Sequence, residues 1–404
     1  MRILFFTHGK VCATEGGTER TTITVATSLS KYYACKCYSL YESPLDAPKE
    51  ECFIKEFIWN FSPENEKAII YLRSIVKAYN IDVIINQGSF QHTKYIRKAI
   101  EGLPCYIVFA HHFEPLSEAA YFSWGYFISQ PFPRTVKGLI FYLYQLFLFP
   151  WIKKKRIQKL ASWYNESYSF ADRVVLLSKS FVQSFSDFSG IKDNRKFTII
   201  PNGLSFTEFL PLSKISEKDK IVLIVSRLDD RYKNISLALN IWNKVIQKNK
   251  DMDGWTLKIV GHGPDKNNYQ RQIQKMKIPN VSLEGRQDPV PYYKKASIFL
   301  MTSNSESWGL TLTEAMQFGV IPVALNTYAS LSEIINNNCD GIIVPSDDIK
   351  GFEQSIVKLI RNEPIRKKMA LNAIENIKRF SQEQIAKKWH NLFLDLLLND
   401  HQYD

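Results

Sequence analysis

The chain has 404 residues, 45% of them hydrophobic and 23% charged, which is typical of a globular protein and excludes a low-complexity chain. At about 100–200 residues per domain, this length predicts two domains. The formal net charge of +12 is compatible with three kinds of partner: a nucleic acid, an anionic membrane or a phosphorylated substrate. The sequence has no zinc-finger spacing, basic zipper or aromatic RNA-binding strand, so nucleic acid is the weakest of the three.

The six cysteines form no CxxC pair, and several lie in apolar runs. We therefore expect free thiols in a reducing, cytoplasmic compartment. Cys35 and Cys37 have no nearby His or Cys that would complete a metal site. The first ten residues contain too short an apolar core for a signal peptide, and no segment reaches the ~20 apolar residues of a membrane span.

Short apolar segments alternate with longer helical patterns along the first 200 residues, which is typical of βαβ units around a parallel sheet. The predicted helices are 18–31, 64–80, 91–100 and 157–171. The predicted strands are 3–7, 33–40, 83–86, 106–110, 174–178 and 198–201.

The pattern restarts after a polar, turn-rich join near 202–220. Its predicted strands are 221–226, 257–260, 281–283, 298–302, 322–325 and 342–344. We expect an α/β chain of two doubly wound, Rossmann-like domains, 1–205 and 206–380, whose sheets face a cleft. A helix in 381–404 is expected to return to the first domain. Ligands of such folds bind at the carboxyl ends of the strands.

The loop "SRLDDRYKN" follows the strand 221–226 and places two cations, Arg227 and Lys233, six residues apart. Arg offers a planar fork and Lys a compact charge, and both suit phosphate oxygens. A solvated basic loop that also contains Arg231 explains the pattern equally well.

Glycines follow two further strands, in "GHGPD" and "EGRQD". Gly263 would let a ligand approach the backbone, although a lone GxG is weak evidence. Backbone groups at Arg286 and Gln287 could contact the edge of a base, and a plain tight turn is an equal alternative.

The stretch "SNSESWGLTLTEAMQFG" contains two acids, Glu306 and Glu314, around the start of a helix expected to begin near 308–310 and to end at Gly319. The helix N-terminus suits a diphosphate, and Gly309 removes a side chain that would block it. One acid could bind ribose hydroxyls and the other a transferred sugar. Alternatively, Glu306 is an acid favoured by the helix dipole and Glu314 a solvated helix residue.

The stretch "ESWGLTLTEAMQFGVIPVA" resembles the E-x7-E signature of the family-4 retaining glycosyltransferases, with Trp308 where Phe is commoner. "SRLDDRYKN" resembles the family's Arg/Lys pair, "IPNGLSF" its interdomain join, "GGTERTT" its Gly-Gly-x-Glu-Arg loop and "AHHFEP" its His-bearing loop. The resemblance covers nearly the whole chain in order, except residues 115–155.

The resemblance implies a GT-B fold, an acceptor bound mostly by the first domain, and no metal. It implies that Arg227 and Lys233 stabilise the leaving diphosphate, that Glu314 binds ribose and that Glu306 binds the donor sugar. It also implies a hydrogen bond from His112 to the reacting sugar; the spacing of His112 to Phe113 favours it over His111. The full implied donor site is Gly16, Gly17, Arg227, Lys233, Gly263, Arg286, Gln287, Glu306, Trp308, Gly309, Leu310 and Glu314.

Residues 121–159 are dense in aromatics and leucines and include the basic run 153–156. The segment from Leu139 to Arg156 suits the interface of an anionic membrane, where rings lie among headgroups and cations contact anionic lipid. A buried helix pair that extends the first domain's core is the alternative.

We interpret the chain as a retaining, metal-independent glycosyltransferase with no cofactor beyond its nucleotide-sugar, a UDP-sugar or else a GDP-sugar. The expected acceptor is a lipid-linked or cell-envelope glycan, as in lipopolysaccharide or capsule assembly, at the cytoplasmic face of a membrane. Two alternatives are a nucleotide-sugar epimerase of the same architecture and a non-catalytic, membrane-peripheral nucleotide-binding protein.

Overall fold

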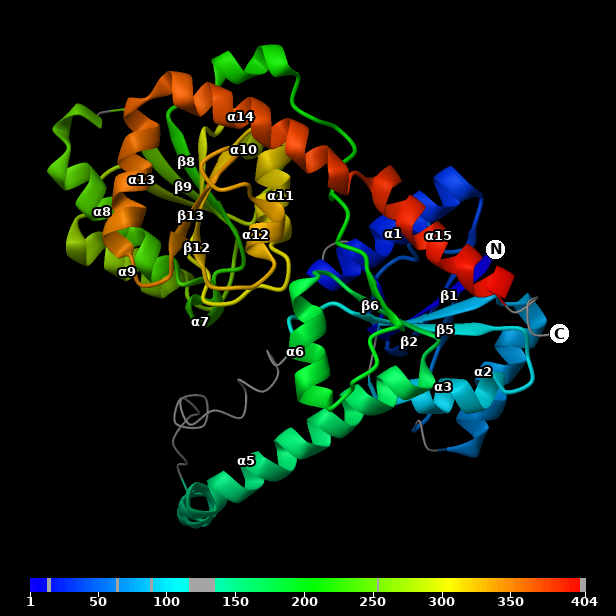
Figure 1. The fold of residues 1–404 in the computed structure, drawn as a ribbon. Helices are drawn as coiled ribbons and strands as arrows, with labels where there is room; N and C mark the ends of the chain where they lie inside the picture. The colour runs from blue at the N-terminus through cyan, green and yellow to red at the C-terminus, as the bar shows by residue number, and fades with distance from the viewer. Residues whose placement is uncertain (13–15, 63–64, 88–89, 116–134, 253, 400–404) are drawn as a thin grey trace. The chain divides into compact units, whose positions relative to one another are not determined.

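The computed structural model describes the chain except residues 13–15, 63–64, 88–89, 116–134, 253 and 400–404. It divides into two compact units, Met1–Ile200 with the segment from Ala386 onward, and Pro201–Ile385. The predicted divisions after residues 205 and 380 lie close to these. Each unit is a parallel sheet with helices packed on it (Figure 1).

The first unit contains a seven-stranded sheet in the order β3-β2-β1-β4-β5-β6-β7, and every pairing in it is parallel. Its core strands are apolar and buried on both faces, as parallel sheets require. The strands are β1 (Arg2–Gly9), β2 (Lys36–Ser43), β3 (Lys55–Ile58), β4 (Val83–Asn86), β5 (Tyr106–His111), β6 (Arg173–Leu176) and β7 (Phe197–Ile199).

Helices connect these strands and cover the sheet. They are α1 (Gly17–Tyr33), α2 (Glu66–Tyr79), α3 (His92–Ile100), α5 (Val136–Phe170) and α6 (Ser180–Ser189). Local signals fix their ends: the Asn65 side chain accepts a hydrogen bond from the backbone of Lys67 at the start of α2, and Asn80 ends that helix in a left-handed conformation.

Helix α5 is much longer than the predicted 157–171 and takes in the whole segment from Leu139 to Arg156. The Thr135 side chain caps its start, and Pro150 lies inside it. An internal proline removes a backbone hydrogen bond and bends a helix, and Figure 1 shows the first turns running in a different direction from the rest.

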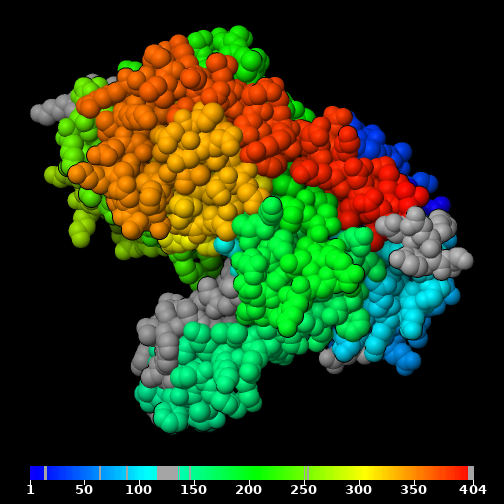
Figure 2. Space-filling model, viewed as in Figure 1, coloured from blue at the N-terminus to red at the C-terminus, as the bar shows by residue number. Residues whose placement is uncertain are grey.

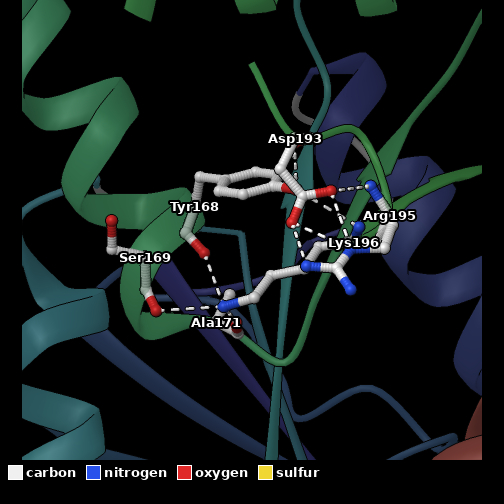
Figure 3. Close-up of polar contacts among 6 residues, drawn as sticks. All are labelled: Tyr168, Ser169, Ala171, Asp193, Arg195 and Lys196. Carbon is white, nitrogen blue, oxygen red and sulfur yellow. Dashed lines mark hydrogen bonds and ion pairs between the residues drawn. The ribbon is translucent and has the colours of Figure 1, made fainter. Parts of the chain in front are cut away.

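The carboxyl end of α5 is held by one lysine that precedes β7 (Figure 3). The Lys196 ammonium donates to the carbonyls of Tyr168, Ser169 and Ala171 at 3.1, 3.0 and 2.8 Å. These are carbonyls that a helix leaves without internal partners. The Tyr168 hydroxyl also donates to the carbonyl of Asp193, so the last turn is fixed on both sides.

Replacing Lys196 by methionine is expected to destabilise the first unit by about 2 kcal/mol, because charge-assisted hydrogen bonds and the favourable charge at a helix end are both lost. Thermal unfolding of the variant, followed by circular dichroism, checks this. The exposed Lys192→Met change in the same unit is the control. Equal melting temperatures for the two variants would contradict the role of Lys196.

The second unit contains a six-stranded parallel sheet in the order β10-β9-β8-β11-β12-β13, so both units place their first strand at the same point in the order. The strands are β8 (Ile221–Val225), β9 (Thr256–Val260), β10 (Val281–Gly285), β11 (Ile298–Met301), β12 (Ile321–Asn326) and β13 (Ile342–Pro345). All six predicted strands of this unit are present.

The connecting helices of the second unit begin soon after most of its strands. They are α7 (Asp230–Lys233), α8 (Ile235–Lys248), α9 (Lys266–Met276), α10 (Val290–Lys295), α11 (Leu310–Gln317), α12 (Leu331–Ile334), α13 (Ile349–Arg361) and α14 (Glu363–Ile377). Short 3-10 turns are η2 (Leu212–Glu217), η3 (Lys250–Met252) and η4 (Lys378–Phe380).

The last helix, α15 (Gln382–Asn399), begins in the second unit and from Ala386 onward groups with the first. Its His390 ring stacks on Tyr33 of α1, with ring centroids 4.0 Å apart. The apolar residues at helical spacing, Trp389 and Phe393 among them, are buried.

Candidate active site

A pocket opens at the carboxyl ends of β8 and β11 in the second unit, the edge where doubly wound sheets bind ligands. Two predicted site residues, Lys233 and Glu306, line it together with Thr302, Ser303 and Thr311. The rest of the lining is mostly apolar and comes from the two strands and the residue directly after β8: Ile224, Val225, Ser226, Phe299, Leu300 and Met301.

Lys233 and Glu306 form a close ion pair in this pocket, with Nζ 2.5 Å from Oε1. The Ser303 hydroxyl donates to the same oxygen at 2.8 Å. The lysine side chain is 24% exposed and the glutamate 13%, so both remain accessible from the pocket. Within the described part of the chain, Glu306 Oε2 has no hydrogen-bond partner, and a carboxylate oxygen in that state can accept a ligand hydroxyl.

Asn304 ties the loop that carries Glu306 to the short helix that carries Lys233. Its backbone N–H donates to the carbonyl of Tyr232 at 2.8 Å, and its side chain donates to the carbonyl of Arg231 at 2.9 Å. The side chain of Asn234 donates to its Oδ1 at 3.1 Å. Sequence reasoning missed this role, although an asparagine beside the acid in "SNSES" is a signal for a loop anchor.

The loops after β8 and β9 pack backbone against backbone, and Gly263 permits this. A Cβ at this position would lie 2.4 Å from the carbonyl oxygen of Leu228. The contact is completed by a hydrogen bond from the backbone of Leu228 to the carbonyl of His262 at 2.9 Å. Asp265 then accepts a hydrogen bond from the first backbone N–H of α7, that of Asp230, at 2.8 Å. The "GHGPD" loop therefore supports the segment between Arg227 and Lys233.

Arg227 itself is exposed at the end of β8 and does not line the pocket. Its guanidinium forms no hydrogen bond or ion pair with the described residues. Arg286 and Gln287 are likewise exposed, after β10, and lie outside the lining. Their predicted contacts to a phosphate and a base remain predictions.

Helix α11 begins at Leu310, as expected, directly after a glycine in the left-handed region. Gly309 has φ of +77°, a conformation that side chains disfavour, which explains a glycine at this point. The Trp308 side chain is buried and packs edge-on against Phe380, with ring centroids 5.2 Å apart. Its side chain is thus part of the core, and a role in donor binding would fall to its backbone.

The two acids of the E-x7-E pattern occupy different environments. Glu314 lies in the second turn of α11, is fully buried and is absent from the pocket lining. Its Oε1 accepts a hydrogen bond from the Ser205 hydroxyl at 2.6 Å and its Oε2 one from the Tyr293 hydroxyl at 2.9 Å. Neither donor was identified from the sequence. The solvated alternative for Glu314 is wrong, and ribose binding by this residue remains a prediction.

In the first unit, Gly16 precedes α1 and Gly17 is its first residue. His112 directly follows β5 and is buried. Its Nε2 lies 2.8 Å from the side-chain nitrogen of Gln87, whose Oε1 accepts a hydrogen bond from the Thr22 hydroxyl at 2.8 Å. Because the amide nitrogen donates, the neutral His112 ring carries its proton on Nδ1. Gln87 was missed, although it directly follows β4.

The neighbouring His111 is a core residue. Its Nε2 lies 3.2 Å from the Tyr164 hydroxyl, and its ring packs among Phe90, Phe109 and Phe185. Burial lowers the pKa of His111 to about 3, so it is neutral at physiological pH. This environment gives His111 a structural role, and the preference for His112 as the reactive-site histidine remains a prediction.

Two parallel α/β sheets with a shared strand order are the architecture of the GT-B fold. The crystal structure of Anabaena HepE in complex with UDP and glucose has this fold, with a TM-score of 0.72, 16% identity and coverage of 98% of this chain and 100% of that chain. The crystal structure of TarM also has this fold, with a TM-score of 0.70 and 13% identity. The match covers 97% of this chain and 98% of the TarM chain.

Residues 206–376 match the family model "Glycosyl transferases group 1", in agreement with the resemblance. The amylovoran biosynthesis glycosyltransferase AmsD of Erwinia amylovora is 27% identical over 231 residues, which cover 56% of this chain and 63% of AmsD. The exopolysaccharide phosphotransferase SCO2592 of Streptomyces coelicolor is 28% identical over 229 residues, 56% of this chain and 24% of that protein. The chain thus matches less than two thirds of the length of either relative.

Proposed function

We propose that the protein is a retaining glycosyltransferase that moves a sugar from a UDP-sugar to a lipid-linked or cell-envelope glycan. The observation that carries the proposal is the Lys233–Glu306 pair in the pocket at the carboxyl ends of β8 and β11. The names of AmsD and SCO2592 support an envelope polysaccharide, and the UDP bound in the HepE crystal structure supports a UDP-sugar as the donor.

Each residue of the site has a part in this chemistry. Lys233 and Arg227 stabilise the negative charge that develops on the leaving diphosphate, a role that a divalent cation fills in other enzymes. The start of α11 at Gly309 adds backbone N–H groups. Glu306 accepts hydrogen bonds from the donor sugar and Glu314 from ribose. His112 donates to the reacting sugar, and the leaving phosphate takes the acceptor's proton at the same face.

The membrane part of the proposal is supported by the first half of α5. Ile140, Tyr144, Phe147 and Trp151 recur at helical spacing and are exposed, Phe147 by 86%. The ammonium of Lys155 lies 3.7 Å from the centroid of the Trp151 ring. Figure 2 shows this half of the helix at the periphery of its unit. Aromatic side chains beside cations suit an anionic lipid interface, and this supports the proposed location at the cytoplasmic face of a membrane.

No helix among the described residues has both the length and the apolar character needed to cross a bilayer. We propose that binding through α5 is peripheral. Each cation near an anionic surface contributes about 1 kcal/mol.

Replacing Lys153, Lys154, Lys155 and Arg156 by glutamine is expected to weaken binding to vesicles that contain anionic lipid at least tenfold, at about 1 kcal/mol per charge removed. Co-sedimentation with vesicles of 30% phosphatidylglycerol measures this. The matched control removes the same number of charges from the second unit, at Lys266, Arg271, Lys275 and Lys277, all exposed. Equal sedimentation of both variants and the wild type would contradict the membrane contact.

The transferase itself is tested by incubating the protein with UDP- and GDP-sugars, with and without an envelope lipid extract, and following free nucleoside diphosphate. Release that depends on the extract supports the proposal. Formation of an epimeric nucleotide-sugar without an acceptor would identify the epimerase alternative, and binding without turnover the non-catalytic one.

A further inference from the structure

A carboxylate held between two histidines lies at the carboxyl edge of the first unit's sheet. Glu42, near the end of β2, has Oε2 2.8 Å from Nδ1 of His8 at the end of β1. Its Oε1 is 2.8 Å from Nε2 of His92, the first residue of α3. The three residues come from separate elements, and the site described above uses none of them.

The histidines differ in exposure. The His8 side chain is 76% exposed, whereas the His92 side chain is 5% exposed. The His92 ring is held by edge-on packing against Phe6 and Trp59, with ring centroids 4.9 and 6.2 Å apart. Glu42 is thereby fixed from the buried side and orients a ring that faces solvent.

The carboxylate fixes the proton position on His8. A carboxylate only accepts hydrogen bonds, so Nδ1 of His8 must donate to it. The neutral ring then has an unprotonated Nε2, which is free to accept a hydrogen bond. Burial alone would raise the pKa of Glu42, but the hydrogen bonds and charges of His92 and His8 outweigh it and hold that pKa below its ordinary value. The carboxylate is therefore ionised at neutral pH.

If the role of this cluster were only structural, its unpartnered buried nitrogen atoms would cost free energy of folding. Both ring nitrogens of His92 are buried and make no hydrogen bond of good geometry among the described residues, although Nε2 lies 2.8 Å from Glu42 Oε1. Leaving a buried polar atom without a partner costs roughly 1–3 kcal/mol. No three His, Cys, Asp or Glu side chains in the described part of the chain are arranged to hold a metal ion. These observations favour a role in orienting His8.

The chemistry of the ligand follows from the charges. An ionised carboxylate beside His8 disfavours a diphosphate, whereas an imidazole acceptor and a carboxylate suit the hydroxyl groups of a sugar. The cations suited to a diphosphate are in the second unit, at Lys233 and Arg227. A transferase needs a second, hydroxyl-bearing substrate, and the carboxyl edge of a doubly wound sheet is where ligands bind.

We propose that Nε2 of His8 accepts a hydrogen bond from a hydroxyl group of the acceptor glycan, and that Glu42 and His92 are its positioning residues. This inference rests on the proposed transferase function. In this proposal, the first unit binds one hydroxyl group of the acceptor through residues on β1, β2 and α3.

Three variants test it: His8→Gln, Glu42→Gln and, as a matched control, the exposed Glu101→Gln of the same unit. With the envelope lipid extract as the varied substrate, His8→Gln and Glu42→Gln are expected to raise the acceptor KM about tenfold, the equivalent of one hydrogen bond. The KM for the nucleotide-sugar and the Glu101→Gln enzyme should be unchanged. An unaltered acceptor KM in His8→Gln would overturn the proposal.

A spectroscopic readout separates positioning from a general structural effect. In protein labelled with ¹⁵N-histidine, the wild-type His8 signal should show the proton on Nδ1. In Glu42→Gln, the amide nitrogen can donate to Nδ1, so the proton is expected on Nε2. A wild-type His8 with its proton on Nε2 would refute the arrangement.

The failure of this inference and the failure of the transferase proposal give different results. If the wild-type enzyme transfers no sugar at all, the transferase proposal has failed. If the wild-type enzyme is active and His8→Gln has normal acceptor kinetics, this inference has failed.

Discussion

Replacing Lys233 by methionine is expected to reduce glycosyl transfer by about 10²–10³-fold, because removing one preorganised charge from a developing oxyanion has an effect of this size. Glu306→Gln is expected to cause a similar loss. The glutamine keeps the shape of the side chain but carries no charge, so the ion pair with the ammonium, whose Nζ is 2.5 Å from the carboxylate, is lost. Both variants should unfold at temperatures near that of the wild type, because the pair is partly solvent-exposed and its net stability is small.

Initial rates with the active nucleotide-sugar measure this effect, and circular dichroism confirms folding. The matched control is Lys214→Met, an exposed lysine that pairs with Glu217 in the same unit. It should retain wild-type turnover. If either site variant keeps more than about a tenth of the wild-type rate, the pocket of β8 and β11 is not the reaction site.

Gly263→Ala is expected to destabilise the second unit by roughly 3 kcal/mol, at the upper end of typical overpacking costs. The added Cβ would meet the carbonyl oxygen of Leu228 at 2.4 Å, and a backbone group cannot rotate away as a flexible side chain can. The loop after β8 must therefore move. Because that loop carries Arg227 and leads to Lys233, affinity for a nucleoside diphosphate should fall together with stability.

Differential scanning calorimetry measures this loss, which corresponds to a drop of about 6–12 °C for a unit of this size. The control is Gly9→Ala, where an added Cβ has no atom within 4 Å and the backbone is not in the left-handed region. A melting temperature for Gly263→Ala equal to that of this control would show that the two loops do not pack as closely as described.

The sequence predicted the sheets well, for a physical reason. Strands buried on both faces are short apolar runs, and each such run in the second unit is a strand. Strand β3 was missed because "KEFI" is a four-residue edge strand with two charged residues, which resembles a loop. Helix α5 was predicted only from residue 157, because its first half exposes apolar side chains and lacks the polar face of a surface helix.

The candidate site was predictable where motif residues lie in loops after strands. Lys233 and Glu306 meet because parallel strands bring their carboxyl ends to one edge. The partners of Glu314 were not predictable, since Ser205 and Tyr293 are distant in sequence and only the packing around α11 brings them together. The contact of Gln87 with His112, and those of the two histidines with Glu42, were not predictable for the same reason, because these residues are distant in sequence.

The most direct test of the account is isothermal titration of UDP into the wild type and into an Arg227→Met, Lys233→Met double variant. The account predicts one UDP site in the wild type and a loss of affinity of at least about 100-fold in the double variant, since two cations on a diphosphate each contribute about 1.5–3 kcal/mol. Equal affinity of the two proteins, or no UDP binding by the wild type, would contradict it.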